Sequence, residues 1–193
     1  MNNAIKFKRA NSESLASKSR RNSNKENENL KGKKPDFKLV MNVVDEILFG
    51  EVKPPKSKNS TLLLNKDLVK LANFQAGSLD ELIKKYGNRT GLASFGIWIC
   101  GERIYIYDMD LNYDGIYKMT LTSNLIVPTS QTQFVSLIPV LEAFYNIKDR
   151  ISNVLEITHD NLLDSTSRSM YGRKPTSSPK PVKIPIIGLQ PKK

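Results

Sequence analysis

The chain has 193 residues, of which 30 are Lys or Arg and 19 are Asp or Glu, and its formal net charge at pH 7 is +11. A single cysteine excludes an intramolecular disulfide, and one cysteine with one histidine excludes the usual four-ligand zinc site. No window holds the roughly 18 consecutive apolar residues that a membrane span needs. The N-terminus also lacks the apolar core of a secretion signal. We therefore expect no transmembrane segment, no secretion signal and, at most, peripheral membrane contact.

The positive charge is concentrated at the two ends of the chain. Residues 1–38 carry 11 basic and 4 acidic residues, and residues 165–193 carry 7 basic residues and no acidic one. Residues 39–164 carry 12 basic and 15 acidic residues. A nearly neutral body with two cationic arms is typical of a protein that binds a polyanion. We predict a disordered basic arm over 1–36, a compact core over 37–164 and a Pro-rich basic tail over 165–193.

The first half of the core is predicted to be helical. Apolar residues between 37 and 50 recur at helical spacing, and Gly50 is a natural stop, so the pattern predicts an amphipathic helix. A second helix fits 64–75. Ser78 and Glu81 have the spacing of a capping box, which predicts a short helix that ends at Gly87.

The second half of the core is predicted to be a sheet followed by a helix. Segments 94–100, 103–109 and 116–122 are rich in Ile, Tyr and Trp, which predicts a three-stranded antiparallel meander, with 125–128 as a short edge strand. A long helix fits 136–157. Its predicted buried stripe consists of Val140, Leu141, Phe144, Ile147, Ile151, Val154 and Leu155. The expected fold class is therefore α+β, a small antiparallel meander packed with about four helices and flanked by disordered tails.

Four residues of the meander, Trp98, Ile99, Ile104 and Ile106, are assigned to core packing. Cys100 follows a run of apolar residues and is predicted to be a buried structural thiol.

No residue set in the sequence requires an enzyme. His159 stands beside Asp160, but no serine or cysteine lies in a nucleophile-elbow context. The acidic segment 108–115 lacks the Gly and Glu that a calcium loop needs at its sixth and twelfth positions. It is interpreted as a hairpin turn. We expect no catalytic residue, no metal site and no cofactor.

Candidate binding residues for nucleic acid or membrane are the basic residues of the two arms and of the linker that begins at Val52. They are Lys6, Lys8, Arg9, Lys18, Arg20, Arg21, Lys31, Lys33, Lys34, Lys53, Lys56, Lys58, Arg173, Lys174, Lys180 and Lys183. Only Phe7 and Tyr171 interleave with the charges, so we expect phosphate contact without base stacking. An anionic membrane surface would attract the same side chains.

Short motifs leave other interpretations open. Lys25-Glu26-Asn27 matches the KEN degron of cell-cycle proteins, and the basic pair at 20–21 with the cluster at 31–34 approximates a bipartite nuclear-import signal. Ser178-Pro179 has the form of a proline-directed phosphorylation site. The apolar run over 182–189 is a candidate docking peptide for a protein partner.

The layout resembles a known family. A basic N-terminal arm ends in the linker Val52-Lys53-Pro54-Pro55-Lys56-Ser57-Lys58 and is followed by a compact α+β core. This arrangement resembles the matrix proteins of rhabdoviruses, especially those that infect plants. The resemblance implies a non-enzymatic structural protein of the virion and the host cytoplasm, with the nucleus left open. Such a protein condenses ribonucleoprotein, contacts anionic membrane and self-associates.

One motif of that family is absent. Animal members often carry a Pro-Pro-x-Tyr budding motif, and Ser57 stands at its fourth position here, so that function is not carried over. The leading hypothesis is an oligomeric adaptor whose arms bind RNA or a nucleocapsid and an anionic membrane. The alternative is a nuclear chromatin-associated or cell-cycle regulatory protein with a working KEN degron and a protein-docking core.

Overall fold

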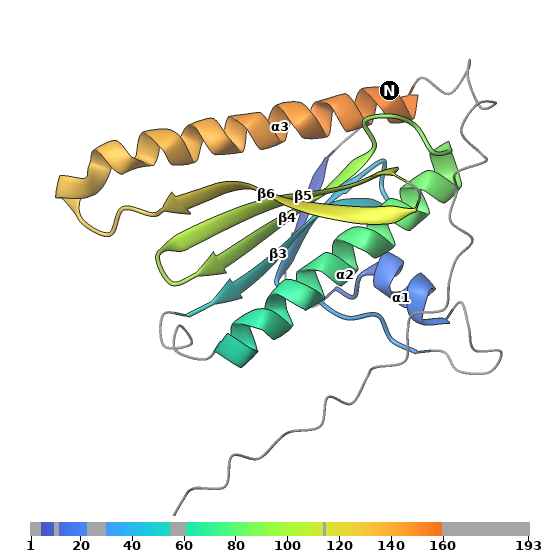
Figure 1. The fold of residues 1–193 in the computed structure, drawn as a ribbon, viewed down its shortest axis with the longest axis horizontal. Coiled ribbons are helices and arrows are strands. Elements are labelled where there is room, and N and C mark those ends of the chain that lie inside the picture. The colour runs from blue at the N-terminus through green and yellow to red at the C-terminus, as the bar shows by residue number, and fades with distance from the viewer. Residues whose placement is uncertain (1–4, 10–11, 23–29, 55–60, 114, 160–193) are drawn as a thin grey trace, which may run out of the picture.

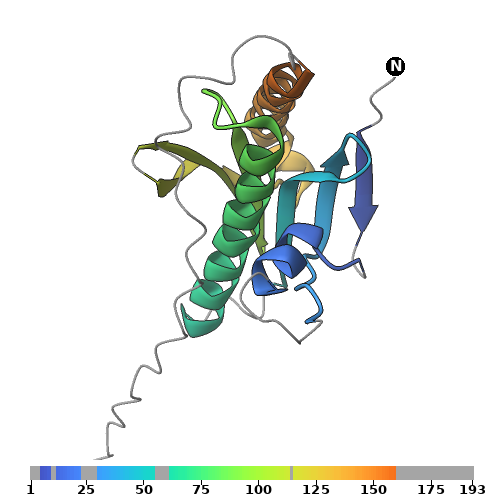
Figure 2. The same ribbon diagram turned by 90° about the vertical axis from the view of Figure 1, so that its right-hand side faces the viewer.

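A six-stranded mixed sheet lies between two long helices in the computed structural model, which describes residues 5–9, 12–22, 30–54, 61–113 and 115–159. The strands are β1 (Lys6–Arg9), β2 (Phe37–Met41), β3 (Asp45–Lys53), β4 (Ala93–Cys100), β5 (Arg103–Tyr113) and β6 (Ile116–Ile126). The helices are α1 (Leu15–Asn22), α2 (Thr61–Tyr86) and α3 (Leu137–His159), with the 3-10 helix η2 (Gln131–Ser136) immediately before α3. Helices α2 and α3 cover opposite faces of the sheet (Figures 1 and 2).

The strands follow one another in the order β1 to β6 across the sheet. All neighbouring pairs are antiparallel except β3 and β4, which are parallel. Helix α2 connects these two strands, as a crossover between parallel strands requires. The α+β class is therefore confirmed, but the meander is the second half of a larger mixed sheet.

The predicted helix over 37–50 is wrong, because this segment forms the β2–β3 hairpin. Leu39 pairs with Leu48 and Met41 with Asp45. Six consecutive residues of β3, 46–51, are buried, since helices cover both faces of the sheet. A strand buried on both faces has a nearly continuous apolar sequence, which also satisfies helical spacing.

The two helices predicted over 64–75 and 78–87 are one continuous helix, α2. Ser78 does not cap a helix, because its hydroxyl donates to the backbone carbonyl of Glu46 on β3. Gly87, with φ +81°, ends the helix as predicted. The described residues therefore contain three α-helices and one 3-10 helix instead of about four helices.

The predicted meander is confirmed as β4, β5 and β6. Gly101 (φ +61°) and Gly115 (φ +71°) occupy the two turns, where a left-handed backbone favours glycine. Strand β5 continues to Tyr113, so most of the acidic segment expected to form the turn belongs to the strand. Residues 125 and 126 complete β6 and do not form a separate edge strand.

The predicted long C-terminal helix is confirmed as α3, with its buried face shifted from the expected stripe. The buried residues are Val140, Ala143, Ile147, Ile151, Val154 and Thr158. Leu141 is 52% exposed and Phe144 is 41% exposed, so the prediction that both are buried is wrong. The small Ala143 side chain faces the sheet, and two large apolar side chains are left on the outside.

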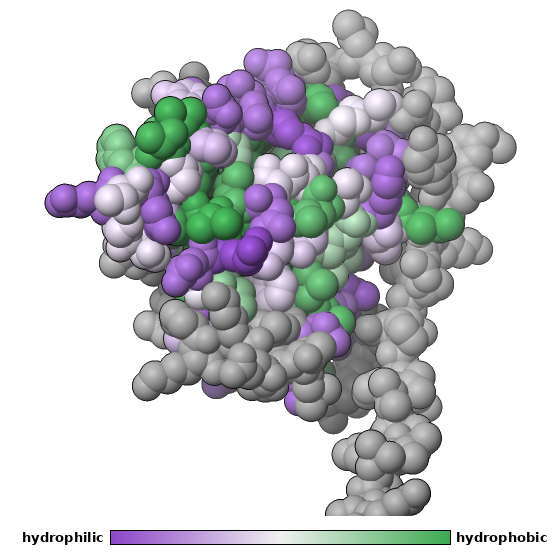
Figure 3. All heavy atoms as spheres, turned by 60° about the vertical axis from the view of Figure 1, so that its left-hand side comes forward, coloured by the Kyte–Doolittle hydropathy of each residue, from purple (hydrophilic) through white to green (hydrophobic). Residues whose placement is uncertain are grey.

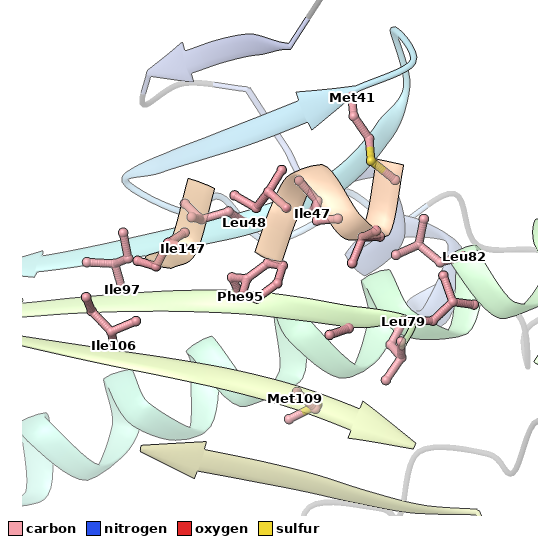
Figure 4. Close-up of a cluster of buried hydrophobic side chains, with 14 of the residues drawn as sticks. Met41, Ile47, Leu48, Leu79, Leu82, Phe95, Ile97, Ile106, Met109 and Ile147 are labelled. Atoms are coloured by element: carbon pink, nitrogen blue, oxygen red, sulfur yellow. The ribbon is translucent and has the colours of Figure 1, made fainter. Parts of the chain in front are cut away.

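The core consists of two clusters of buried side chains. The larger one joins the sheet to α3 and to the C-terminal half of α2, with Phe95, Ile97 and Ile106 near its centre (Figure 4). The smaller one joins the sheet to the first half of α2 and contains Trp98 and Cys100. The core-packing assignments of Trp98, Ile104 and Ile106 are confirmed, and Ile99 packs partly buried against the larger cluster. Cys100 is buried and free, as predicted.

The expected disorder of 1–36 is wrong for the part of this segment that the structure describes. Strand β1 pairs with β2 at one edge of the sheet, and α1 packs against α2. Gly32 is buried beneath the start of α1, where an added Cβ would lie 2.4 Å from the Ser14 carbonyl oxygen. The composition predicted disorder because it has few large apolar residues, but polar contacts hold this segment to the core. The expected tail over 165–193 lies outside the described residues.

Candidate anion-binding surface

The predicted basic residues of the N-terminal segment are spread over several elements. Lys6 and Lys8 lie exposed on β1, and Lys31, Lys33 and Lys34 lie exposed in the segment before β2. The residues outside the described part of the chain are Lys56, Lys58, Arg173, Lys174, Lys180 and Lys183, together with the side chain of Arg9.

The basic residues of α1 have partners within the protein. The Lys18 ammonium lies 3.3 Å from a carboxylate oxygen of Glu13. The Arg20 guanidinium donates to the backbone carbonyl of Asn73 on α2 at 3.4 Å, and Arg21 donates to a backbone carbonyl as well. These side chains therefore help to attach α1 to the rest of the protein, and fewer of their N–H groups are available to an external anion.

A buried carboxylate at the start of α1 explains why this short helix is attached to the core. Glu46 of β3 accepts hydrogen bonds from the backbone N–H groups of Leu15 (3.0 Å) and Ala16 (3.3 Å) and from the Ser14 hydroxyl (2.6 Å). An anion is stabilised at a helix N-terminus, and the helix gains partners for N–H groups that would otherwise have none. Sequence reasoning missed this contact because about 30 residues separate Glu46 from α1.

A shallow groove of about 590 Å³ lies between the segment before β2 and the first half of α2. Its lining residues are Lys33, Asn65, Lys66, Asp67, Val69 and Lys70. Lys33 comes from the predicted basic arm. Lys66 and Lys70 were not among the predicted residues, and they line the groove because the segment before β2 lies beside the first half of α2.

Internal ion pairs neutralise part of this groove. The Lys70 ammonium lies 2.7 Å from Glu51, which is almost fully buried on β3. Asp67 pairs with Lys53 at 3.4 Å, so the candidate residue Lys53 is also engaged. For the other two lysines of the groove, the described residues provide no carboxylate within 4 Å. These two ammonium groups are the cations available to a ligand.

The groove has the chemistry of a phosphate site without base recognition. Two ammonium groups and the Asn65 amide can donate to phosphate oxygens. Its described lining contains no aromatic side chain on which a base could stack. Lys8 lines a different hollow, so the structure does not gather the predicted cations into one cluster.

The residues considered for catalysis are placed where they have structural partners or face solvent. His159 is the exposed last residue of α3, and its neighbour Asp160 lies outside the described residues. The Asp108 carboxylate accepts a hydrogen bond from the Arg150 guanidinium of α3. Within the described part of the chain, no three His, Cys, Asp or Glu side chains are arranged to hold a metal ion.

A second exposed feature is an apolar stripe where α3 begins. Phe134 and Val135 of η2 are exposed, as are Ile138, Leu141 and Tyr145 of α3. Figure 3 brings this end of the molecule forward and shows hydrophobic side chains at its surface. The helical residues recur at intervals of three and four, the spacing with which helices pair.

Comparison with known proteins supplies no relative. No family model matches the chain, and searches of curated proteins and of solved structures each return no match. Among the described helices, none combines the length and apolar character needed to cross a bilayer.

Proposed function

We propose that this protein is a non-enzymatic structural adaptor that binds the phosphate backbone of RNA, free or in a nucleocapsid, and an anionic membrane. In this proposal the folded core also self-associates. Together these activities are similar to those of a viral matrix protein in virion assembly. The observation that carries the RNA-binding part is the groove beside α2, where Lys33 and Lys66 have no described carboxylate partner. The chain's net charge of +11 adds a long-range attraction to any polyanion.

The stripe on η2 and α3 supports the self-association part of the proposal. It leaves five large apolar side chains in solvent, and contiguous exposed apolar patches commonly mark association surfaces. Two copies of α3 packed antiparallel would cover Ile138, Leu141 and Tyr145 on both. Sedimentation velocity should show a concentration-dependent dimer that Leu141→Lys dissociates.

The test of RNA binding is a salt titration with single-stranded RNA. Each lysine that neutralises a phosphate contributes about 0.7 to the slope of log affinity against log salt concentration. Changing Lys33 and Lys66 to Ala should therefore reduce the slope by about 1.4. The loss should be similar for RNAs of different sequence, because the groove reads only the backbone.

A matched control is the double substitution Lys118→Ala and Lys148→Ala. It removes the same charge from exposed positions on β6 and α3, away from the groove. If both double variants reduce the slope equally, net charge and not the groove determines binding. If neither changes it, the proposed RNA site is wrong.

A further inference from the structure

The tip of the β2–β3 hairpin exposes two adjacent valines. Val43 is 68% exposed and Val44 is 51% exposed. The turn holds Asn42 at φ +48° and Val43 at φ +73°, both in the left-handed region. Asparagine tolerates this region and glycine favours it, whereas a β-branched residue is strained there. Folding alone therefore favours glycine at position 43, and a strained, exposed valine indicates a role outside folding.

Further apolar side chains surround the tip. Leu15, at the start of α1, is 51% exposed and lines a hollow of about 290 Å³ together with Val43 and Val44. Leu15 and Val44 also line a second hollow, of about 520 Å³. Ile5 is also exposed, and it directly precedes the residue that pairs with Val40 near the end of β2. The apolar surface thus extends from the hairpin to α1 and the start of β1.

Lysines border this apolar surface. Lys8 lines the smaller hollow and Lys84 the larger, and Lys6 lies on β1 beside them. No described carboxylate lies within 4 Å of these three ammonium groups.

The acidic residues nearby are largely engaged by other groups. Asp45 accepts two hydrogen bonds from Lys85 at 2.8 Å, and Glu13 pairs with Lys18. Glu46 lines both hollows and pairs with Lys38. Glu81 accepts a hydrogen bond from the Ser19 hydroxyl and is the one carboxylate in the described lining of the larger hollow without a described cation within 4 Å. The border of the tip is therefore positive, with an excess of free ammonium groups over free carboxylates.

We infer that this end of the molecule docks on an anionic lipid bilayer, with Val43 and Val44 inserted among the acyl chains and the three lysines at the headgroups. Apolar side chains that enter a bilayer together with basic residues that meet anionic headgroups are the two contributions that hold a peripheral protein on a membrane. The inference rests on the membrane part of the proposed function and is independent of its RNA part.

The bilayer surface and the RNA groove lie at opposite ends of α2. Lys66 and Lys84 are 18 positions apart on this helix, which corresponds to about 27 Å along its axis. One molecule could therefore hold an RNA-protein complex against a membrane without the two partners meeting at one site.

The test is co-sedimentation of the full-length protein with vesicles of phosphatidylcholine alone and with vesicles that also contain phosphatidylserine. We expect binding to the anionic vesicles only. Val43→Gly combined with Val44→Ser should weaken this binding by about 10-fold or more. Val43→Gly alone should leave the melting temperature unchanged or raise it, because glycine relieves the strain. RNA binding by both variants should remain at the wild-type level.

A control and a direct probe complete the test. Ile116→Ser removes a comparably exposed β-branched residue from β6, at the opposite edge of the sheet, and should leave vesicle binding unchanged. An environment-sensitive fluorophore on Val44→Cys, with the buried Cys100 changed to Ser, should shift its emission to the blue on anionic vesicles. If the wild-type protein binds RNA but neither kind of vesicle, the membrane inference is wrong while the proposed RNA binding stands. That result would favour a protein partner for the tip of the hairpin. Vesicle binding that the valine changes do not weaken, or an unshifted fluorophore, would also overturn it.

Discussion

The ammonium nitrogen of Lys38 lies 2.5 Å from a carboxylate oxygen of Glu46, and both side chains are at least 96% buried. The same nitrogen donates to the backbone carbonyl of Glu13 at 2.6 Å. Because Glu46 also accepts from the first N–H groups of α1, one buried ion pair connects β2, β3 and the N-terminal segment. Buried charges of this kind are tolerated only where hydrogen bonds satisfy them, as they do here.

Removing the cation from this pair should destabilise the whole fold. Lys38→Met leaves the Glu46 carboxylate buried without its charge partner, which typically costs about 3–5 kcal/mol of unfolding free energy. Urea unfolding followed by circular dichroism measures this loss. The double substitution Lys38→Met with Glu46→Gln should recover part of it, because the amide is neutral and its oxygen still accepts from α1. A double variant less stable than Lys38→Met would contradict this account.

A second buried acid should make stability depend on pH. Burial raises the pKa of Glu51 above its ordinary value near 4.5, although Lys70 partly opposes the shift. A raised folded-state pKa means that the native protein binds the proton more tightly than the unfolded chain does. The stability that the protonated Glu51 side chain contributes is therefore present below pH 4.5 and is lost as the pH rises through the folded-state pKa.

Glu51→Gln should remove this dependence. The variant's unfolding free energy relative to the wild type should increase as the pH is raised from 4.5 to neutral. Urea unfolding at several pH values checks it, with Glu142→Gln on the exposed face of α3 as the control. A constant difference between variant and wild type would mean that Glu51 titrates normally.

The close approach of α2 to the sheet depends on a glycine. A Cβ added at Gly96 of β4 would lie 2.8 Å from the Gln75 Oε1 and 3.0 Å from a methyl carbon of Leu71. Both neighbours are fully buried, so neither can move aside without disturbing the core. We expect Gly96→Ala to lower the unfolding free energy by about 1–3 kcal/mol.

Gly77 of α2 provides the matched control. The nearest atom to its added Cβ is the Ala16 carbonyl oxygen at 3.5 Å, which is ordinary contact. Gly77→Ala should therefore stabilise the protein by up to about 1 kcal/mol through helix propensity. Thermal unfolding of the two variants should give shifts of opposite sign. A Gly96→Ala variant as stable as the wild type would mean that packing against α2 does not determine the tolerance at Gly96.

The fold could be predicted from sequence where the local pattern is unambiguous. Strands β4 to β6 are dense in β-branched and aromatic residues with glycine at both turns, and α3 is long and periodic. The β2–β3 hairpin could not be predicted in the same way. Its turn has Asn42 and Val43 at positive φ without any glycine, and β3 is buried on both faces. Ser78 fits a capping box, yet its hydroxyl bonds to a carbonyl 32 residues away.

The candidate binding residues could be identified by type but not by arrangement. Charge counting found Lys33 but not its neighbour Lys66, because the groove forms only when the segment before β2 packs beside α2. It also included Lys18 and Lys53, which carboxylates of the protein neutralise. Long-range pairing decides which lysines are available, and composition contains no information about it.

The N-terminal segment should contribute measurably to stability, contrary to what its composition suggests. Deleting residues 1–36 removes α1 and leaves Glu46 without three of its hydrogen-bond donors. Hydrogen bonds to charged groups are worth about 1.5–3 kcal/mol each, so the melting temperature should fall by at least about 10 °C. Deleting only residues 1–9 removes β1 and should cost less, because β1 contributes four strand pairings and the side chains of residues 6–8 are exposed.

Charge loss alone must be separated from the loss of these contacts. The full-length protein with Lys33 and Lys66 changed to Ala keeps α1 and should melt within about 4 °C of the wild type, because each exposed substitution typically changes stability by no more than about 0.5 kcal/mol. Differential scanning calorimetry of the four proteins provides the comparison. Equal melting temperatures for the wild type and the 1–36 deletion would mean that the contacts of α1 add no net stability. In that case the segment would behave as the disordered arm that its composition predicts.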